Sequence, residues 1–151
     1  MTKIPEGFHT VTPTLIVNGA AKAIDLYKKA FGAQELYRME GKKGKIMHAC
    51  ITVGNSKVFL CDTNPEMGCG TPSSSSFYLY VDNVDSTFKQ AKGAGLAENS
   101  PVQDMFWGDR TGNLKDSFGI SWTVATHVRE VSKEEMEEGR KKFASNKHKA
   151  A

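Results

Sequence analysis

One order of secondary-structure signals occurs twice in this chain, and this internal repeat restricts the fold more than any single motif. A run rich in β-branched residues is followed by an apolar stripe at helical spacing, a glycine and three further strand-like runs. Gly32 ends the first stripe and Gly95 ends the second, and aligning these two glycines superimposes the two copies. The sequence therefore predicts two β-α-β-β-β modules in one chain.

The first copy is expected between residues 8 and 62. Its helix begins after Asn18, a residue type that caps helices, and its apolar stripe consists of Ala20, Ile24, Tyr27 and Phe31. Its strands are predicted at residues 11–17, 33–40, 45–53 and 57–62. Turns that contain glycine separate the last three strands.

The second copy is expected between residues 75 and 128. Its helix follows Asp82 or Asn83, and Val84, Phe88 and Ala91 form the apolar stripe. Its strands are predicted at residues 77–81, 97–105, 110–115 and 120–127. Residues 63–74, between the copies, are rich in Gly, Pro and Ser and lack an apolar period, which predicts a linker or a mobile loop.

Residues 131–147 are predicted to form a C-terminal helix and tail outside the repeat. Ser132 and Glu135 have the spacing of a capping box, which predicts a helix over residues 133–143. Residues 144–151 are expected to fray. The whole chain, residues 1–151, is thus expected to be a single α+β domain.

Composition excludes several classes of protein. The chain has 151 residues and 39% hydrophobic and 25% charged residues, which is typical of a soluble globular domain. Its net charge of +3 is small and evenly spread, so we expect no nucleic-acid partner. No apolar run approaches the roughly 20 residues that span a bilayer, and the first residues lack the apolar region of a signal peptide. We therefore expect neither a membrane protein nor a secreted one.

The three cysteines, Cys50, Cys61 and Cys69, are an odd number and lack a Cys-x-x-Cys spacing, which favours a reducing, cytoplasmic location. Cys50 and Cys61 are expected to be small buried residues, and Cys69, in the loop, is expected to be the more reactive thiol. Cys50 shares a strand face with His48, but no third group that would orient a Cys/His pair is evident.

Alternation along the strands assigns polar side chains to one face of each predicted sheet. The polar positions come from four strands: Thr12, Thr14 and Ile16; His48, Cys50 and Thr52; Ser76, Tyr78 and Tyr80; Ser121, Thr123 and Ala125. The alternate positions are largely apolar, as expected of a face that packs under helices. The polar faces are therefore expected to line a concave pocket for a small molecule.

His48 is the first candidate for a catalytic residue. An imidazole on the polar face could exchange protons, contact a ligand or bind a metal, and the alternative is a hydrogen-bonded structural histidine. His9 precedes the first strand and His127 ends the last one, and each has the same structural alternative. A metal site made of His9, His48 and His127 is a further hypothesis, although their spacing has no recognised signature.

Four other side chains are candidate ligand contacts in the second half. The Arg110 guanidinium suits carboxylate or phosphate oxygens at the rim of the pocket, and an ion pair with Asp109 or Asp116 is the alternative. Trp107 is expected to form a wall or a cover of the pocket. Tyr78 and Tyr80 point to the same side and could hydrogen-bond a ligand.

Several short motifs, in a fixed order, accompany the repeat. They are Asp25-Leu26-Tyr27, His9 to Pro13, Met47-His48-Ala49, Trp107-Gly108-Asp109-Arg110 and Asp116-x-Phe118-Gly119-x-x-Trp122. Together they resemble the vicinal oxygen chelate superfamily, which includes glyoxalase I, the bleomycin and fosfomycin resistance proteins and the extradiol dioxygenases. Within it the chain is most similar to the PhnB-like branch, over residues 8–128.

The resemblance implies two βαβββ modules whose sheets form a concave ligand site, a homodimer and, in many members, a divalent metal. The four metal-ligand positions of the family fall on Thr12, Ser76, Thr123 and, within one residue, Leu60. None of these is a histidine or a carboxylate, the residues that hold such metals. We therefore expect no metal cofactor at these positions, and a divalent metal on the three histidines is the alternative.

Three functions follow as hypotheses. The first is a protein that binds or sequesters a small molecule, or a metal-free enzyme, with its ligand near His48, Thr12, Tyr78 and Arg110. The second is a metal-dependent lyase, isomerase or dioxygenase with a non-standard histidine site. The third is a purely structural dimer module, which would leave the polar strand faces without a role.

Overall fold

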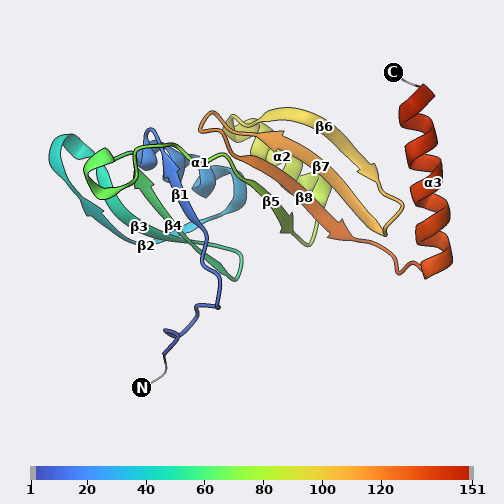
Figure 1. The fold of residues 1–151 in the computed structure, drawn as a ribbon, viewed down its shortest axis with the longest axis horizontal. Coiled ribbons are helices and arrows are strands. Elements are labelled where there is room, and N and C mark those ends of the chain that lie inside the picture. Colours follow the sequence, from blue (N-terminus) through green and yellow to red (C-terminus); the bar gives the residue numbers. More distant parts are fainter. Residues whose placement is uncertain (1–2, 150–151) are drawn as a thin grey trace.

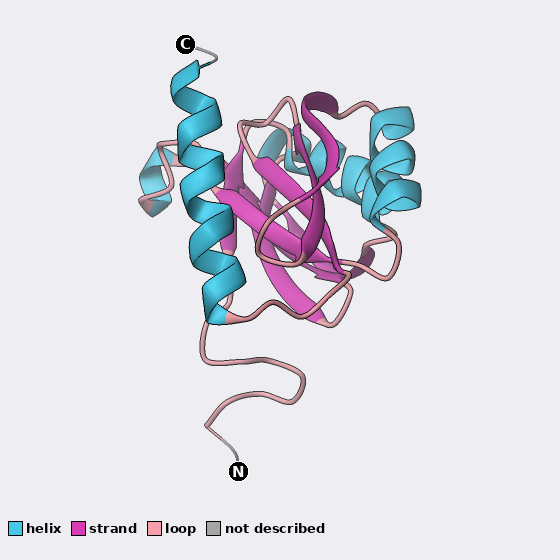
Figure 2. Cartoon of the chain, turned by 90° about the vertical axis from the view of Figure 1, so that its right-hand side faces the viewer, coloured by secondary structure: helices cyan, strands magenta, loops and turns pink. Residues whose placement is uncertain are grey.

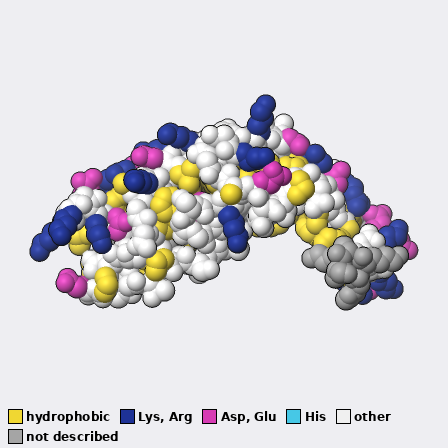
Figure 3. All heavy atoms as spheres, turned by 90° about the horizontal axis from the view of Figure 1, so that it is seen from above, with side chains coloured by type: hydrophobic (Ala, Val, Ile, Leu, Met, Phe, Trp, Pro, Cys, Tyr) yellow, Lys and Arg dark blue, Asp and Glu magenta, His cyan; other side chains and the backbone are white. Residues whose placement is uncertain are grey.

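The structure is a computed structural model that describes the backbone of residues 3–149 and the side chains of residues 3–146. Two four-stranded mixed sheets lie side by side, and each carries one helix on the same side (Figure 1). Seen from above, the molecule is arched (Figure 3). This arrangement confirms the predicted α+β fold built from two βαβββ modules.

The first sheet has the strand order β1-β4-β3-β2. Its elements are β1 (Thr14–Val17), α1 (Ala20–Phe31), β2 (Gln34–Glu40), β3 (Ile46–Val53) and β4 (Ser56–Asp62). Strand β1 is parallel to β4, and the other pairs are antiparallel. The first strand begins three residues later than predicted, because the backbone before it contains Pro13, which has no N–H for a ladder.

The second sheet repeats this order as β5-β8-β7-β6. Its elements are β5 (Ser76–Tyr80), α2 (Val84–Ala94), β6 (Ala97–Asp104), β7 (Asp109–Lys115) and β8 (Ser121–His127). Strand β5 is parallel to β8, and β7 pairs antiparallel with β6 and β8. These bounds match the predicted elements to within one residue.

The two helices begin in different ways. Asn83 caps α2 as predicted, because its side chain accepts a hydrogen bond from the Ser86 N–H. Asn18 does not cap α1, which starts after Gly19 at a φ of 104°. The carboxylate of Asp62, at the end of β4, instead accepts the N–H groups of Gly19 and Ala20 over 2.8 and 2.9 Å. The cap of α1 is therefore supplied by a residue distant in the sequence.

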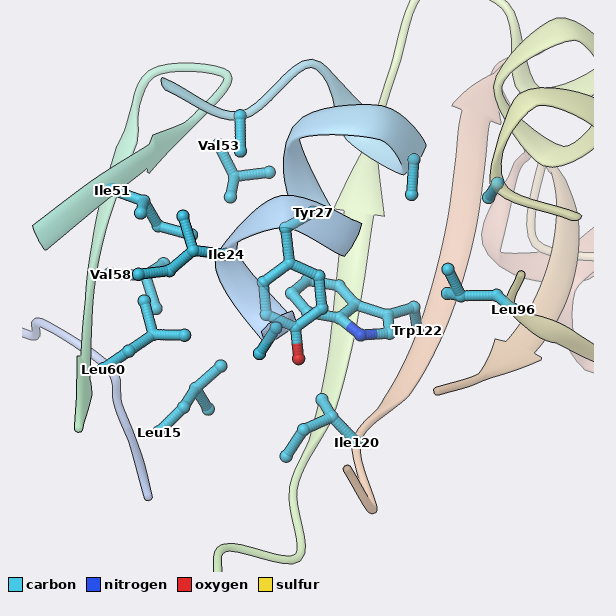
Figure 4. Close-up of a cluster of buried hydrophobic side chains, with 14 of the residues drawn as sticks. Leu15, Ile24, Tyr27, Ile51, Val53, Val58, Leu60, Leu96, Ile120 and Trp122 are labelled. Atoms are coloured by element: carbon cyan, nitrogen blue, oxygen red, sulfur yellow. The ribbon is translucent and has the colours of Figure 1, made fainter. Parts of the chain in front are cut away.

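The core lies between the helices and the faces of the sheets that the helices cover, which we call the outer faces. Leu15, Ile51 and Leu60 are almost completely buried beneath α1. At the centre of the molecule the ring of Tyr27 packs edge-on against Trp122, with 5.2 Å between their centroids (Figure 4). Helices α1 and α2 also contact each other, and Gln90 donates a hydrogen bond to the Lys29 carbonyl over 2.9 Å. One apolar core thus unites the two modules.

The segment between the modules is more ordered than a free linker. It contains a 3₁₀ turn, Pro65–Met67, and Asn64 and Cys69 form a short antiparallel bridge. Ser73 then exchanges hydrogen bonds with the backbone of Ile16 in β1. Residues 63–74 therefore connect the modules as a loop that is hydrogen-bonded to itself and, near its end, to β1.

Helix α3 (Lys133–Lys149) lies in front of the sheets in the view of Figure 2, and its Phe143 ring packs 5.7 Å from the ring of Phe106 in the second module. Ser132 accepts the Glu135 N–H as the capping box predicts, but the Glu135 carboxylate pairs with Arg129 instead of closing the box. The helix continues past residue 143, so the predicted fraying from residue 144 was wrong as far as Lys149, and residues 150–151 lie outside the described range. In the part of the chain that is described, no helix is long and apolar enough to cross a membrane.

Candidate functional site

The faces of the two sheets opposite the helices, which we call the inner faces, carry the polar side chains that alternation predicts. On the first sheet a cross-strand row runs from Thr14 through Phe59 and Cys50 to Tyr37. Cys50 is completely buried in this row, whereas 44% of Tyr37 is exposed. The row therefore presents aromatic rings over a buried thiol.

His48 lies beside this row on β3. Its Nε2 atom is 3.1 Å from the Tyr37 hydroxyl, and its ring centroid is 4.7 Å from that of Phe59. The ring thus has a polar partner on one side and an aromatic partner on another. This environment is compatible with two roles for His48: it can hold the Tyr37 and Phe59 rings in place, or it can contact a ligand directly.

A pocket of about 570 Å³ opens over Tyr37 and Phe59. The chain before β1 forms its other wall, and the complete lining is Lys3, Ile4, Pro5, Phe8, His9, Thr10, Thr12, Tyr37 and Phe59. The ring of Phe8 packs against Phe59 at 5.7 Å, and the Lys57 ammonium lies 4.1 Å from the centre of the Phe8 ring. We call this space the first-sheet pocket; it contains the predicted residues His9 and Thr12.

The inner face of the second sheet is organised around Asp109, the first residue of β7. This carboxylate, only 3% exposed, accepts hydrogen bonds from the hydroxyls of Tyr78 at 2.7 Å and Tyr80 at 2.9 Å. Nδ1 of His127 lies 2.8 Å from its other oxygen, and the Trp107 indole N–H donates to the Tyr78 hydroxyl over 3.2 Å. We call these five residues the Asp109 cluster.

Hydrogen bonds and burial together shift the pKa values of the Asp109 cluster. Burial by itself would raise the pKa of Asp109, but the bonds from His127, Tyr78 and Tyr80 lower it below its ordinary value. The hydrogen bonds to Asp109 and to Glu130 raise the pKa of His127. Burial raises the pKa of Tyr78 to about 12. Near neutral pH, a buried carboxylate therefore faces two neutral phenols and an imidazole that holds its proton more tightly than usual.

Gly108 allows the turn that places Trp107 and Asp109. Its φ is 97°, and a Cβ atom there would collide with the carbonyl oxygen of Arg129. Its own carbonyl accepts the N–H groups of Val128 and Arg129 over 2.9 and 3.2 Å. Hydrogen bonds thereby hold the turn after β6 against the segment that directly follows His127, the last residue of β8.

The remaining predicted residues divide between the two faces. Ser76 and Thr123 lie on the inner face of the second sheet, where Thr123 accepts a hydrogen bond from Asn113 over 2.9 Å. Arg110 lies on the outer face, where it pairs with Asp85 of α2 and Asp104 of β6 at 3.0 and 3.1 Å. The expected position of Arg110 at the pocket was wrong, because neighbouring residues of a strand face opposite ways and Asp109 occupies the inner position. Its predicted alternative partners, Asp109 and Asp116, were wrong as well.

The family's metal positions do not suit a metal in this chain. Thr12, Ser76 and Thr123 offer only hydroxyl groups, and Leu60 is fully buried on the outer face. Within the described residues, no three His, Cys, Asp or Glu side chains form a group that could hold a metal ion. His9, His48 and His127 are thus not assembled into one site.

Sequence reasoning missed Asp109, Tyr37 and Phe59 as site residues. Asp109 belongs to the Trp107-Gly108-Asp109-Arg110 motif, and strand alternation would have placed it opposite Arg110. Tyr37 had no such signal, because two register shifts in the β2–β3 pairing interrupt the alternation of β2.

Comparisons with known proteins agree with this geometry. The family model of the Glyoxalase/Bleomycin resistance protein/Dioxygenase superfamily matches residues 7–124. An uncharacterized protein of Mycobacterium bovis, Mb0911c, is 40% identical over 136 residues, which cover 84% of this chain and 89% of that protein.

Solved structures share the fold. TioX from Micromonospora sp. ML1 superimposes with a TM-score of 0.67 and 25% identity, over 80% of this chain and 99% of that one. TnmS3, an antibiotic binding protein from Streptomyces sp. CB03234, superimposes with a TM-score of 0.63 and 22% identity, over 84% of this chain and 99% of that one. The PhnB protein from Bacillus cereus superimposes with a TM-score of 0.62 and 18% identity, over 78% of this chain and 99% of that one. The chain belongs to the glyoxalase/bleomycin resistance protein/dioxygenase superfamily.

Proposed function

We propose that this protein binds a small organic molecule in the first-sheet pocket and that it does so without the metal found in many relatives. The observation that carries the proposal is the pocket itself, whose volume of about 570 Å³ lies in the range of small-molecule sites. Tyr37, Phe59 and Phe8 supply flat apolar surface, and His9 and Thr12 supply polar atoms. Such a lining suits a ligand with an aromatic or other flat apolar part.

The family supports the same proposal. TnmS3 is described as an antibiotic binding protein, so a chain of this fold can serve to bind a small molecule. The donor chemistry of Thr12, Leu60, Ser76 and Thr123 supports binding that does not use the family's metal positions. The Asp109 cluster would add a second polar and aromatic surface on the same concave side.

A homodimer is part of the proposal. Tyr37 and Met39 of the first sheet and Tyr78 and Tyr80 of the second leave 44% to 63% of their surface exposed on the inner faces. A second copy would cover these side chains. Sedimentation equilibrium would support this if it gave twice the chain mass of 16.6 kDa and would contradict it if it gave the chain mass at micromolar concentration. We place the protein in the cytoplasm, because its three cysteines are free thiols.

The binding proposal is tested with a library of neutral aromatic fragments, followed by saturation-transfer NMR on the ligands. We expect some fragments to bind the wild type and the Leu36→Ser variant but to lose their signal with Tyr37→Ser. Leu36 is a matched control, because it neighbours Tyr37, is similarly exposed at 47%, and does not line the pocket. Fragments that bind all three proteins equally, or none of them, would contradict the proposed site.

A His48→Ala variant separates a binding site from a structural module. If the ring supports Tyr37 and Phe59 in the pocket, the variant should keep its circular dichroism spectrum and bind the same fragments more weakly. If the variant is folded and its fragment binding is unchanged, His48 is not part of the binding site.

A further inference from the structure

A second cavity, of about 570 Å³, opens at the end of the first sheet and shares no lining residue with the first-sheet pocket. One wall is the turn between β2 and β3, where Gly41, Lys42, Lys45 and Met47 line it. The other wall is the segment that follows β4, residues 63–67. The two segments lie side by side at the end of the molecule away from α3 (Figure 1). We call this space the hairpin cavity.

Two methionines give the hairpin cavity an adaptable apolar lining. Met47 lines it from the β3 side and Met67 from the other wall, and they are 42% and 57% exposed. Gly41 leaves room for the first of them, because a Cβ atom there would lie 2.8 Å from Cγ of Met47. Methionine side chains are flexible and polarizable, and they adjust to the shape of an apolar ligand.

Two lysine ammonium groups accompany this apolar surface. Lys42 and Lys45 both line the hairpin cavity, and none of the ion pairs among the described side chains includes either of them. The carboxylate of Asp62, which also lines the cavity, accepts two N–H groups at the start of α1 and the N–H of Ile46. These donors and the helix dipole offset its charge. The two ammonium groups are therefore available to an anion.

The backbone of the β2–β3 turn is strained between these lysines. Lys43 has a φ of 58° and a ψ of 31°, and it is the only described residue other than glycine with a positive φ. This conformation is uncommon for a residue with a Cβ atom and is found preferentially at ligand sites. It reverses the chain, so that the Lys45 N–H donates to the Lys42 carbonyl over 3.3 Å. The strained turn thus brings together the two lysines that line the cavity.

We propose that the hairpin cavity binds an amphiphilic carboxylate. Its apolar chain lies between Met47 and Met67, and its carboxylate lies beside Lys42 and Lys45. Burial of the chain supplies most of the affinity, and the partly solvated ammonium groups select the charge of the ligand. The hairpin cavity is separate from the first-sheet pocket and takes a different class of ligand, so the two proposals stand or fall independently.

The test follows the methionine methyl groups of the full chain by NMR while sodium octanoate is added. We expect saturable shifts at Met47 and Met67 that give one dissociation constant, with Met→Leu variants assigning the signals. Met39 is the internal control, because it is as exposed as Met67, at 57%, and does not line the cavity. Octanamide and octylammonium, which have the same chain length, should bind at least about fivefold more weakly.

Charge variants locate the carboxylate. Lys42→Gln and Lys45→Gln should each weaken octanoate binding about two- to fivefold. Lys43→Gln is the matched control, because it removes the same charge from the same turn at a residue that does not line the cavity. Glu66→Gln, on the other wall, should bind octanoate as tightly as the wild type or more tightly, since it removes a like charge. Circular dichroism checks that each variant is folded.

Several outcomes would overturn the proposal. These are the absence of saturable shifts at Met47 and Met67 with millimolar octanoate, an equal response of Met39, and equal binding of octanamide. An equal loss of affinity in Lys42→Gln and Lys43→Gln, or weaker binding by Glu66→Gln, would also contradict it. Tyr37→Ser should bind octanoate like the wild type; a loss there would place octanoate in the first-sheet pocket and leave the proposed function standing.

Discussion

The hydroxyl of Tyr27 donates a hydrogen bond of 2.7 Å to Oδ2 of Asp116, and this contact joins helix α1 of the first module to the β7–β8 turn of the second. Asp116 is also nearly buried, and it accepts the Trp122 indole N–H at 3.0 Å and the Phe118 N–H at 2.8 Å. Burial, and then the charge of Asp116, raise the pKa of Tyr27 far above its ordinary value. The motif that begins at Asp116 is thus a structural joint between the two modules.

Replacing Tyr27 by Phe should lower the free energy of unfolding by about 1–3 kcal/mol, because Asp116 loses one donor in a buried site and the ring remains. Urea denaturation followed by tryptophan fluorescence measures the change, since Trp122 packs on Tyr27. Tyr37→Phe is the matched control, because it removes a hydroxyl from a half-exposed ring. Equal losses in the two variants would show that the Tyr27 contact has no special role.

Two glycines of the second module should respond in opposite directions to substitution by Ala. A Cβ at Gly112 would lie 2.6 Å from the Phe88 ring and 2.9 Å from Val102, so Gly112→Ala should destabilise by about 1–3 kcal/mol. Gly93 lies within α2 with no atom near such a Cβ, so Gly93→Ala should stabilise by up to about 1 kcal/mol. Thermal and urea unfolding of both variants check the signs, and a stabilising Gly112→Ala would contradict the packing of α2 on β7.

The contact between Asp109 and His127 should make stability depend on pH. Folding raises the pKa of His127. Its contribution to stability is therefore complete at a pH below the unfolded-state pKa of about 6.5, and it is lost as the pH rises through the higher pKa of the folded state. Folding lowers the pKa of Asp109. Its contribution to stability is therefore present at a pH above the unfolded-state pKa of about 4, and it is lost as the pH falls through the lower pKa of the folded state. The free energy of unfolding of the wild type should therefore exceed that of His127→Gln by a larger margin at a pH of about 6 than at a pH of about 8.5.

Urea denaturation midpoints of both proteins, measured across this pH range, test the predicted direction of the pH dependence. The control is His48→Gln, because the His48 ring is hydrogen-bonded to Tyr37 instead of to a carboxylate. A difference in free energy of unfolding between wild type and His127→Gln that stays constant with pH would mean that folding does not shift the pKa of His127.

Metal removal should leave the fold unchanged. The hydroxyl and aliphatic side chains at Thr12, Leu60, Ser76 and Thr123 give a divalent metal no imidazole or carboxylate ligand. We expect metal analysis by mass spectrometry, after incubation with zinc, nickel, iron and manganese, to find well under one equivalent per chain. We also expect dialysis against chelator to leave the thermal midpoint unchanged. A stoichiometric metal that is lost in His9→Ala, His48→Ala or His127→Ala would instead support the histidine site.

The sequence predicted the part of the fold that depends on local periodicity. The helical spacing of Ile24 and Tyr27 and the alternation of β5 and β8 identified two modules, and both are present. The same alternation placed Tyr78, Tyr80 and Thr123 on one face, because a strand's side chains alternate regardless of which strand pairs with it. The family followed from the repeat together with its ordered motifs.

The structure decided which distant groups meet. Asp62 caps α1 because β4 lies beside β1, and Arg110 pairs with Asp85 because α2 crosses the outer face of its sheet. Asp109 gathers Tyr78, Tyr80 and His127 because β8 lies between β5 and β7. By itself, then, the sequence determined the modules and the two faces of each strand, since burial that repeats every two or 3.6 residues leaves a local pattern. The partners of each polar group were decided only by the tertiary structure, because strand order and helix packing bring together residues whose separation in the chain has no period.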